Sequence, residues 1–171
     1  MIYSVMDKMI GYFGTDARRI NHALKVYGFA SLIAGNEKLA PEICAGIGYA
    51  ALLHDIGISE AERKYNSSAG THQEREGPPV ARAIMEPLGL DAKTIERTCF
   101  IIGHHHSYSF IDGIDFQILV EADFLVNIFE DEFESAAIEA AGKNIFRTES
   151  GLALLKSMYG WPSEDLTSVL R

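Results

Sequence analysis

The feature that most constrains this chain is an apolar run that ends in a histidine beside an aspartate. Residues 43–53 are almost entirely apolar or glycine, and His54 and Asp55 follow directly. A helix that is apolar on every side is buried on every side. Burying an ionised carboxylate costs several kcal/mol unless the group is paired, hydrogen-bonded or bound to a cation. The pair therefore indicates either a hydrogen-bonded core histidine or two metal ligands, and the rest of the chain decides between them.

The size and composition fit one domain with a substantial core. The chain has 171 residues, of which 47% are hydrophobic and 23% are charged, as is ordinary for a globular protein. No apolar run approaches the length that a bilayer requires. We expect a single domain over residues 1–171, with a core at about 15–130 and a helical C-terminal extension over 131–171.

The charge balance and the cysteines narrow the class of partner. Fifteen Lys and Arg residues against 24 Asp and Glu residues give a net charge of -9, so the chain lacks the basic footprint of a protein that binds duplex nucleic acid or anionic membranes. A small anionic substrate stays compatible, because a bound metal supplies local positive charge. Cys44 and Cys99 lie far apart in apolar segments, which is typical of reduced core cysteines in a cytoplasmic protein. The sequence carries no signal for an oligomeric state.

Apolar periodicity predicts helices throughout and no strands, so the expected fold class is all-α, with about seven to eight helices. Residues 58–77 are polar and lack this periodicity, so we expect a long loop there, of the kind that often forms a lid. No pattern is readable from Trp161 to Arg171. The expected helices cover residues 1–13, 15–34, 41–55, 78–87, 92–106, 115–130, 132–142 and 148–159.

Three of the expected helices each bring a costly polar side chain to an apolar face. His22 lies on the buried face of the second helix, His54 and Asp55 end the third, and Asp123 interrupts the apolar stripe of the helix over 115–130. Neutral imidazoles and carboxylates on separate helices suit a shared divalent cation. We therefore expect these four residues to form one metal site.

The order of these four residues resembles the HD-domain superfamily of metal-dependent phosphohydrolases. The segments around them are also similar to that superfamily: NHALKV at 21–26, LHDIG at 53–57 and EAD at 121–123. The resemblance covers roughly residues 15–130. It implies a helical bundle around a metal site, in which the first ion is held by the side chains of His22, His54, Asp55 and Asp123.

Some branches of the superfamily hold a second ion, which Asp55 would bridge to the first. The resemblance then implies one or two histidines at the end of a later helix, where this chain has a run of three. Helical phase favours His105, with His104 or His106 as its companion.

The second ion would also take a histidine four residues before a helix-opening glycine. Gln73 stands at that position relative to Gly77, and His72 is one residue early. His72 is the expected ligand, with Glu74 or Glu76 as the alternatives.

The catalytic candidates follow from the same resemblance. A lysine that often follows the glycine of the HD segment is absent, because Ile58 stands there. Lys64 or Arg63 would then supply the charge that faces the phosphate. Asp55 would act through the metal, and His105 would either bind metal or protonate the leaving group.

The implied activity is hydrolysis of a phosphoester, such as a nucleotide, by a metal-activated water. The partner would be a small phosphorylated substrate, and the cofactor one or two divalent ions, with Fe, Mn, Co, Ni, Zn and Mg all compatible. Two alternatives stay open. One is a mixed-valence di-iron oxygenase, and the other is a binding or signalling module that keeps the metal for folding.

Overall fold

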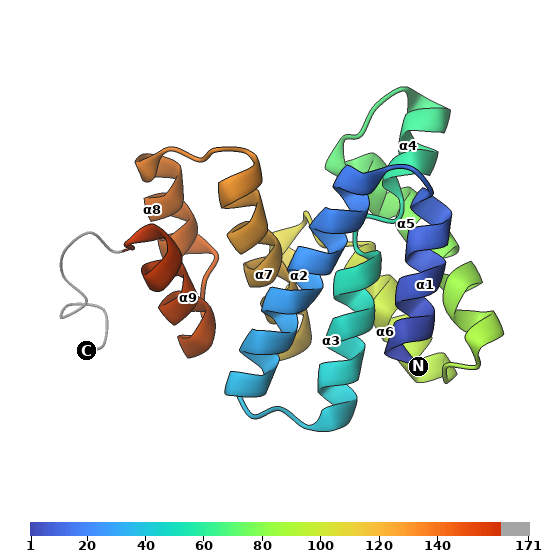
Figure 1. Ribbon diagram of the computed structural model, residues 1–171, viewed down its shortest axis with the longest axis horizontal. Coiled ribbons are helices and arrows are strands. Elements are labelled where there is room, and N and C mark those ends of the chain that lie inside the picture. The colour runs from blue at the N-terminus through green and yellow to red at the C-terminus, as the bar shows by residue number, and fades with distance from the viewer. Residues whose placement is uncertain (162–171) are drawn as a thin grey trace.

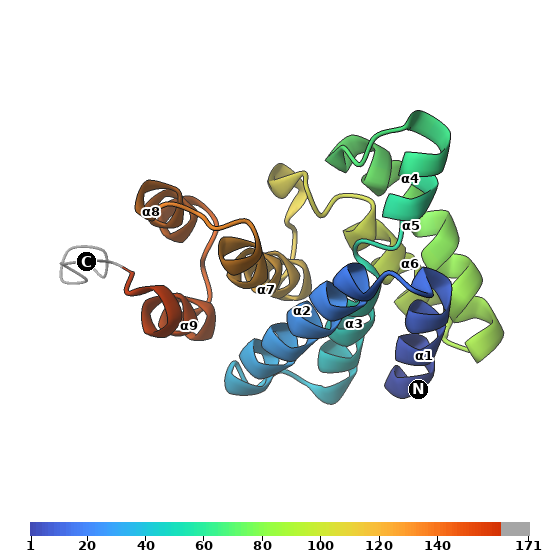
Figure 2. The same cartoon turned by 45° about the horizontal axis from the view of Figure 1, so that its top comes forward.

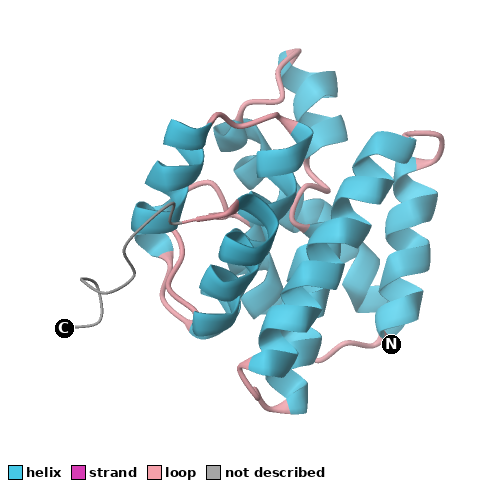
Figure 3. Ribbon diagram, turned by 60° about the vertical axis from the view of Figure 1, so that its left-hand side comes forward, coloured by secondary structure: helices cyan, strands magenta, loops and turns pink. Residues whose placement is uncertain are grey.

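The computed structural model describes residues 1–161, in which helices are joined by loops and turns (Figures 1 and 3). No strand occurs among them, so the all-α prediction is confirmed. None of these helices combines the length and the apolar character that crossing a membrane would need. Residues 162–171 of the expected extension lie outside the described part. The helices are α1 (Ile2–Phe13), α2 (Ala17–Asn36), α3 (Pro41–Leu53), α4 (Ile58–Tyr65), α5 (Gly70–Met85), α6 (Ala92–Ile102), α7 (Ile114–Glu130), α8 (Ser135–Asn144) and α9 (Glu149–Tyr159), with short 3-10 helices at Glu86–Leu88 and Tyr108–Phe110.

Helix α3 lies at the centre of the packing. It contacts α1, α2, α6 and α7, and Figures 1 and 2 show α8 and α9 beyond α7, at the end away from α1 and α5. Its residues Ile47, Ala50 and Ala51 join an apolar cluster with α2 and α7. Its residues Leu52 and Leu53 join a second cluster with α1, α5 and α6. Because residues 43–53 are apolar or small on every side, α3 packs into both clusters. The residues that follow it, His54 and Asp55, therefore lie at the middle of the bundle.

The expected long loop over residues 58–77 is wrong, and so is the expected helix start after Gly77. The structure has α4 and the first turns of α5 in this stretch, and α5 continues through Pro78 and Pro79. The buried side of α5 includes Gln73, Glu76 and Gly77. Since these residues are polar or lack a side chain, the stretch shows no apolar periodicity although it is a helix.

Two glycines let the end of the His-Asp segment approach α5 at backbone distance. A Cβ atom on Gly57 would lie 2.5 Å from the carbonyl oxygen of Gln73 and 2.6 Å from the backbone nitrogen of Gly77. A Cβ atom on Gly77 would in turn lie 2.6 Å from Cγ2 of Ile102. Real side chains do not tolerate such contacts, so glycine at both positions keeps α3, α5 and α6 packed together.

Helix α7 is fixed to the C-terminal helices by a buried carboxylate. Glu121 is fully buried and accepts hydrogen bonds from the backbone amides of Arg147 and Thr148, at 2.6 and 2.9 Å, and from the side-chain amide of Gln117 at 2.8 Å. The hydroxyl of Thr148 donates to its second oxygen. These donors offset the cost of burying the carboxylate. They hold the helix that carries Asp123 in place.

Replacement of Gly57 by alanine should destabilise the protein by about 1–3 kcal/mol, because the new Cβ would meet backbone atoms that cannot move aside. Gly28 is the matched control, since it lies in α2 and a Cβ atom added to it would have nothing within 4 Å. Gly28→Ala should be neutral or stabilising by up to about 1 kcal/mol. Urea unfolding measures both, and equal stability of the two variants would contradict the close approach.

Candidate metal centre

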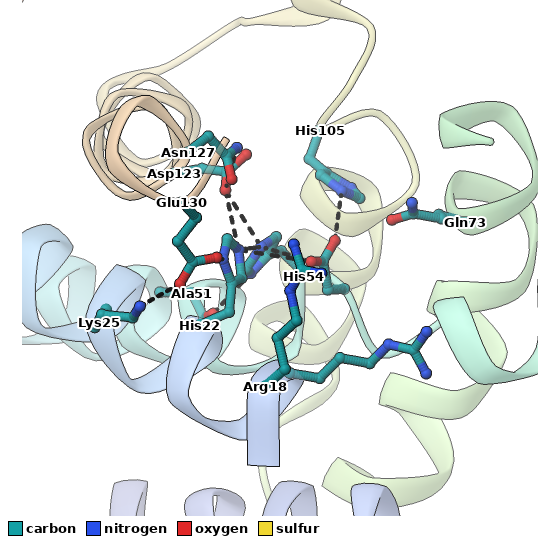
Figure 4. Close-up of polar contacts among 12 residues, drawn as sticks. Arg18, His22, Lys25, Ala51, His54, Gln73, His105, Asp123, Asn127 and Glu130 are labelled. Atoms are coloured by element: carbon teal, nitrogen blue, oxygen red, sulfur yellow. Dashed lines mark hydrogen bonds and ion pairs between the residues drawn. The ribbon is translucent and has the colours of Figure 1, made fainter. Parts of the chain in front are cut away.

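Three helices bring three potential ligands to one point. His22 comes from α2, His54 follows the last turn of α3, and Asp123 comes from α7. The Nε2 atoms of His22 and His54 are 3.2 Å apart, and Oδ1 of Asp123 lies 3.2 Å from the first and 3.6 Å from the second (Figure 4). These ligand atoms all lie within 4.8 Å of one another. The predicted convergence of these side chains is therefore present in the structure.

Asp55 lies between this group and a second one. Its Oδ2 is 3.6 Å from Nε2 of His22 and 3.5 Å from Nε2 of His54, whereas its Oδ1 is 3.4 Å from Nε2 of His105. Asp55, His105 and His106 form a second set whose ligand atoms lie within 4.8 Å of one another. One carboxylate thus presents an oxygen to each group, as a bridging ligand would.

The histidine rings are oriented by hydrogen bonds from their outer nitrogens. Nδ1 of His54 donates to the carbonyl oxygen of Ala51 at 2.9 Å, and Nδ1 of His105 donates to that of Ile102 at 2.8 Å. A carbonyl oxygen only accepts, so these contacts place the proton on Nδ1 and leave the lone pair on Nε2. Metal-bound histidines are held in this manner in most known sites.

His22 is oriented in the same way by a carboxylate that sequence reasoning missed. Its Nδ1 donates to Oε2 of Glu130 at 2.9 Å, and the other oxygen of Glu130 accepts from Lys25. Glu130 ends α7, two helical turns after Asp123. Residues seven apart lie on the same face of a helix, so the spacing from Asp123 to Glu130 was the sequence signal that could have revealed Glu130. Two carboxylates on one face of α7 therefore contact the same imidazole: Glu130 contacts Nδ1 of His22, and Asp123 contacts Nε2.

The resulting arrangement fits a divalent cation. Inner nitrogens with lone pairs and carboxylate oxygens face one another at 3.2–3.6 Å, and proton acceptors at such distances repel. Nε2 of His105 is buried and has no hydrogen-bond partner in the described residues. An unsatisfied buried acceptor costs about 1–3 kcal/mol. One cation in each of the two groups would satisfy these atoms, and mixed imidazole and carboxylate sites suit several divalent first-row metals.

Without a cation, the group takes up a proton instead. Burial lowers the pKa of His22, but hydrogen bonding and charge from Asp123 and the neighbouring carboxylates outweigh it and raise the pKa to about 9. Burial lowers the pKa of His54. Burial also lowers the pKa of His106, with a contribution from His105, to about 4. Burial lowers the pKa of His105 too, but the hydrogen bond and charge of Asp55 outweigh it and raise the pKa. An ion in the first group must therefore displace a proton from His22, whereas His54 and His106 are neutral at pH 7.

The two groups open onto a cavity of about 490 Å³. His22, Asp55, His106 and Asp123 contribute to its wall, together with residues of α2, α4, α5 and α7. His54 and His105 are almost completely buried behind them, at 1% and 3% exposure. A small molecule in the cavity would therefore face the ligand groups directly.

The structure does not bring His72 or Lys64 to the two groups. The ring of His72 stacks on Tyr65 with 4.1 Å between ring centroids. Lys64 forms an ion pair with Glu76. Both side chains belong to the α4–α5 unit that replaced the expected loop, and neither lines the cavity. His72 on α5 thus contacts α4, and Lys64 on α4 contacts α5.

The alternative residues, Glu74 and Glu76 as ligands and Arg63 as the phosphate-facing charge, also form contacts away from the two ligand groups. Glu74 accepts from the backbone amide of His106 at 3.0 Å and from the hydroxyl of Ser107 at 3.1 Å. Glu76 accepts from Tyr65 as well as from Lys64. Arg63 is paired with Glu60 at 2.6 Å on the surface of α4. Glu74 thus positions the histidine segment, but none of the three lies with the potential ligands.

The companion of His105 is His106, and His104 lies elsewhere. Nδ1 of His104 donates to the carbonyl oxygen of Phe100 at 2.7 Å, and its ring lies between those of Phe100 and Phe110. Helix α6 ends at Ile102, before the histidines begin. Helical phase therefore no longer governs which of the three side chains face the site.

Comparison with known proteins agrees with this fold. No protein-family model matches the chain, and no curated protein matches it. Its structure is similar to the crystal structure of a predicted HD superfamily hydrolase from an uncultured Thermotogales bacterium, with a TM-score of 0.65 and 24% sequence identity. The match covers 91% of this chain and 83% of that chain. The predicted resemblance to the HD-domain superfamily is thus confirmed at the level of the fold.

Loss of a ligand should abolish tight metal binding. His54→Ala and Asp123→Asn should each weaken Mn²⁺ binding at least about 100-fold, and Glu130→Gln, which acts through His22, by about 10–100-fold. His72→Ala and His104→Ala are the controls, because the structure places both side chains outside the two groups. Calorimetric titration of chelator-treated protein measures these affinities. Tight binding that survives His54→Ala but not His72→Ala would contradict the site.

Metal binding should release about one proton per chain for the first ion at pH 7. His22 carries this proton below its pKa of about 9, so the affinity should rise about tenfold per pH unit up to that value and then level off. Titrations in buffers of different ionisation enthalpy measure the proton count. A count of zero at pH 7 would show that the metal binds without displacing the His22 proton.

Proposed function

We propose that this protein is a metal-dependent phosphohydrolase that cleaves a phosphoester, such as a nucleotide, with an activated water. The observation that carries the proposal is the shared carboxylate of Asp55, which presents one oxygen to each of two groups of potential ligands beside a cavity. Two such groups could hold a pair of ions, and such a pair would supply charge stabilisation for the attacking and leaving oxygens of phosphoryl transfer. The fold shared with a predicted HD superfamily hydrolase supports the same reaction class.

In this proposal His22, His54, Asp55 and Asp123 would hold one divalent ion, and Asp55, His105 and His106 a second. A bound ion would supply Lewis-acid activation of the water and of a phosphoryl oxygen. The chain supplies the positions: carbonyl oxygens fix the rings of His54 and His105, and Glu130 fixes that of His22. Because these partners are in place before any substrate binds, the reacting groups need little rearrangement.

The structure favours a ligand role for His105 over the proton-donating role. Its Nδ1 proton is given to the carbonyl oxygen of Ile102, and its Nε2 faces Oδ1 of Asp55. The ring is almost fully buried and does not line the cavity. A general acid has to reach the leaving group, so a buried ring that does not line the cavity supports the ligand role for His105.

A di-iron oxygenase is the second candidate, because two ligand groups that share Asp55 also suit two irons. It requires iron in both groups and consumption of oxygen with an organic substrate. A metal-stabilised binding module would show neither reaction.

The test is phosphate release from p-nitrophenyl phosphate and a panel of nucleotides. Metal-free protein should be inactive, and one or more of Mn²⁺, Co²⁺, Fe²⁺, Ni²⁺, Zn²⁺ and Mg²⁺ should restore turnover. Asp55→Asn should lower kcat at least about 100-fold, since it removes the shared charge, while His72→Ala should stay near the unmodified protein. Metal-loaded protein that hydrolyses none of the panel would refute the proposal. Oxygen consumption with two irons per chain would then favour the oxygenase.

A further inference from the structure

The cavity beside the ligand groups is unusually rich in carboxylates for a site that would bind a phosphate. Two arginines, Arg18 and Arg19, also line it. Two divalent cations would bring the formal charge of these side chains to zero. The cavity therefore has little positive charge to spare, even when both ions are counted. Its six acidic side chains are Asp16, Asp55, Glu62, Asp123, Glu130 and Asp131.

The two arginines differ in how firmly they are paired. Arg19 contacts Asp16 at 3.0 Å and Glu62 at 2.6 Å, and its side chain is 25% exposed. Within residues 1–161, Arg18 has one ion pair, 3.9 Å from Asp131, and its side chain is 80% exposed. An exposed pair at that distance contributes almost nothing to stability. Among the described residues that line the cavity, Arg18 is therefore the cation that can turn to a ligand at little cost.

Arg18 lies one helical turn before His22 on α2 and lines the same cavity as His22 and Asp55 (Figure 4). A guanidinium group binds a phosphate through two parallel hydrogen bonds. A phosphate in the cavity would face Arg18 as well as the ligand groups, because both line it. Arg18 could therefore supply the positive charge that the missing lysine after Gly57 would give. Lys64 is less suited to that role, because it is paired with Glu76.

We infer, on the basis of the proposed function, that the substrate is a phosphomonoester whose single phosphate is bound by Arg18, and that nucleoside triphosphates are disfavoured. A triphosphate would bring about two further charges into a cavity whose remaining wall includes Asp16, Glu62 and Asp131. No other weakly paired cation lines this cavity in residues 1–161. Like charges brought together in this way cost affinity. The cavity volume of about 490 Å³ suits a ligand of nucleotide size.

The first test measures phosphate binding in the absence of turnover. Inorganic phosphate is titrated into Mn²⁺-loaded protein, with free Mn²⁺ held constant. Arg18→Ala should weaken phosphate binding about tenfold or more, and Arg18→Lys should weaken it less, because the charge remains without the paired donors. The affinity for Mn²⁺ should not change, which separates a phosphate contact from damage to the ligand groups.

Arg75→Ala is the matched control. Arg75 is similarly exposed at 73%, has a similar 3.9 Å contact with Glu76, and does not line the cavity. It should leave phosphate binding unchanged. Equal phosphate binding by Arg18→Ala and Arg75→Ala would overturn the role of Arg18.

The second test compares kcat/KM for a nucleoside 5′-monophosphate and the triphosphate of the same nucleoside. The monophosphate should be preferred at least about tenfold, and Arg18→Ala should raise its KM by about the same factor as the loss in phosphate affinity. Glu62→Gln removes one negative charge and one of the two ion-pair partners of Arg19, so it should shift the preference toward the triphosphate. Equal or better use of the triphosphate would overturn this inference and leave the proposed function intact. Failure to hydrolyse any phosphoester would overturn the proposed function, and this inference with it.

Discussion

Two carboxylates and three imidazole nitrogens face one another in the interior of this helical bundle, and the rest of the site depends on how their repulsion is resolved. The Nε2 atoms of His22 and His54 are 3.2 Å apart, with Asp55 and Asp123 beside them. Protonation of His22 relieves part of the repulsion, but Nε2 of His105, 3.4 Å from Oδ1 of Asp55, has no hydrogen-bond partner among the described residues. Cations held by the two groups would relieve the rest of the repulsion. Because such a group forms only in the folded chain, metal binding should also stabilise the fold.

The helices and their contacts explain how the group is kept in place. His22 and Glu130 are separated by more than a hundred residues in sequence, yet they share a hydrogen bond because α2 packs against α7. Gly57 and Gly77 let the end of the His-Asp segment pack closely against α5. Glu74 of the same helix accepts a hydrogen bond from the backbone of His106. Arg18, at the mouth of the cavity, is by contrast largely exposed. Hydrogen bonds thus hold the rings of the potential ligands, while Arg18, which we propose binds the substrate, is weakly paired and exposed.

Much of this arrangement could be predicted from the sequence, and the exceptions have physical causes. His22, His54 and Asp123 could be recognised because each interrupts an apolar stripe, and a buried polar residue is the informative departure from such a pattern. The start of the helix over 70–85 could not be predicted, because its buried face carries Gln73 and Glu76 in place of apolar side chains. The choice of His106 over His104 depends on where α6 ends, and helix boundaries are poorly encoded in local sequence. Glu130 was missed because a charged residue at a helix end is usually solvated.

The central claim is that separate helices converge on one shared cation. Anomalous diffraction from crystals of Mn²⁺-saturated protein tests it most directly, because the signal locates the ion itself. We predict a peak within coordinating distance of His22, His54, Asp55 and Asp123. Saturated crystals with no peak among these four side chains would contradict the claim.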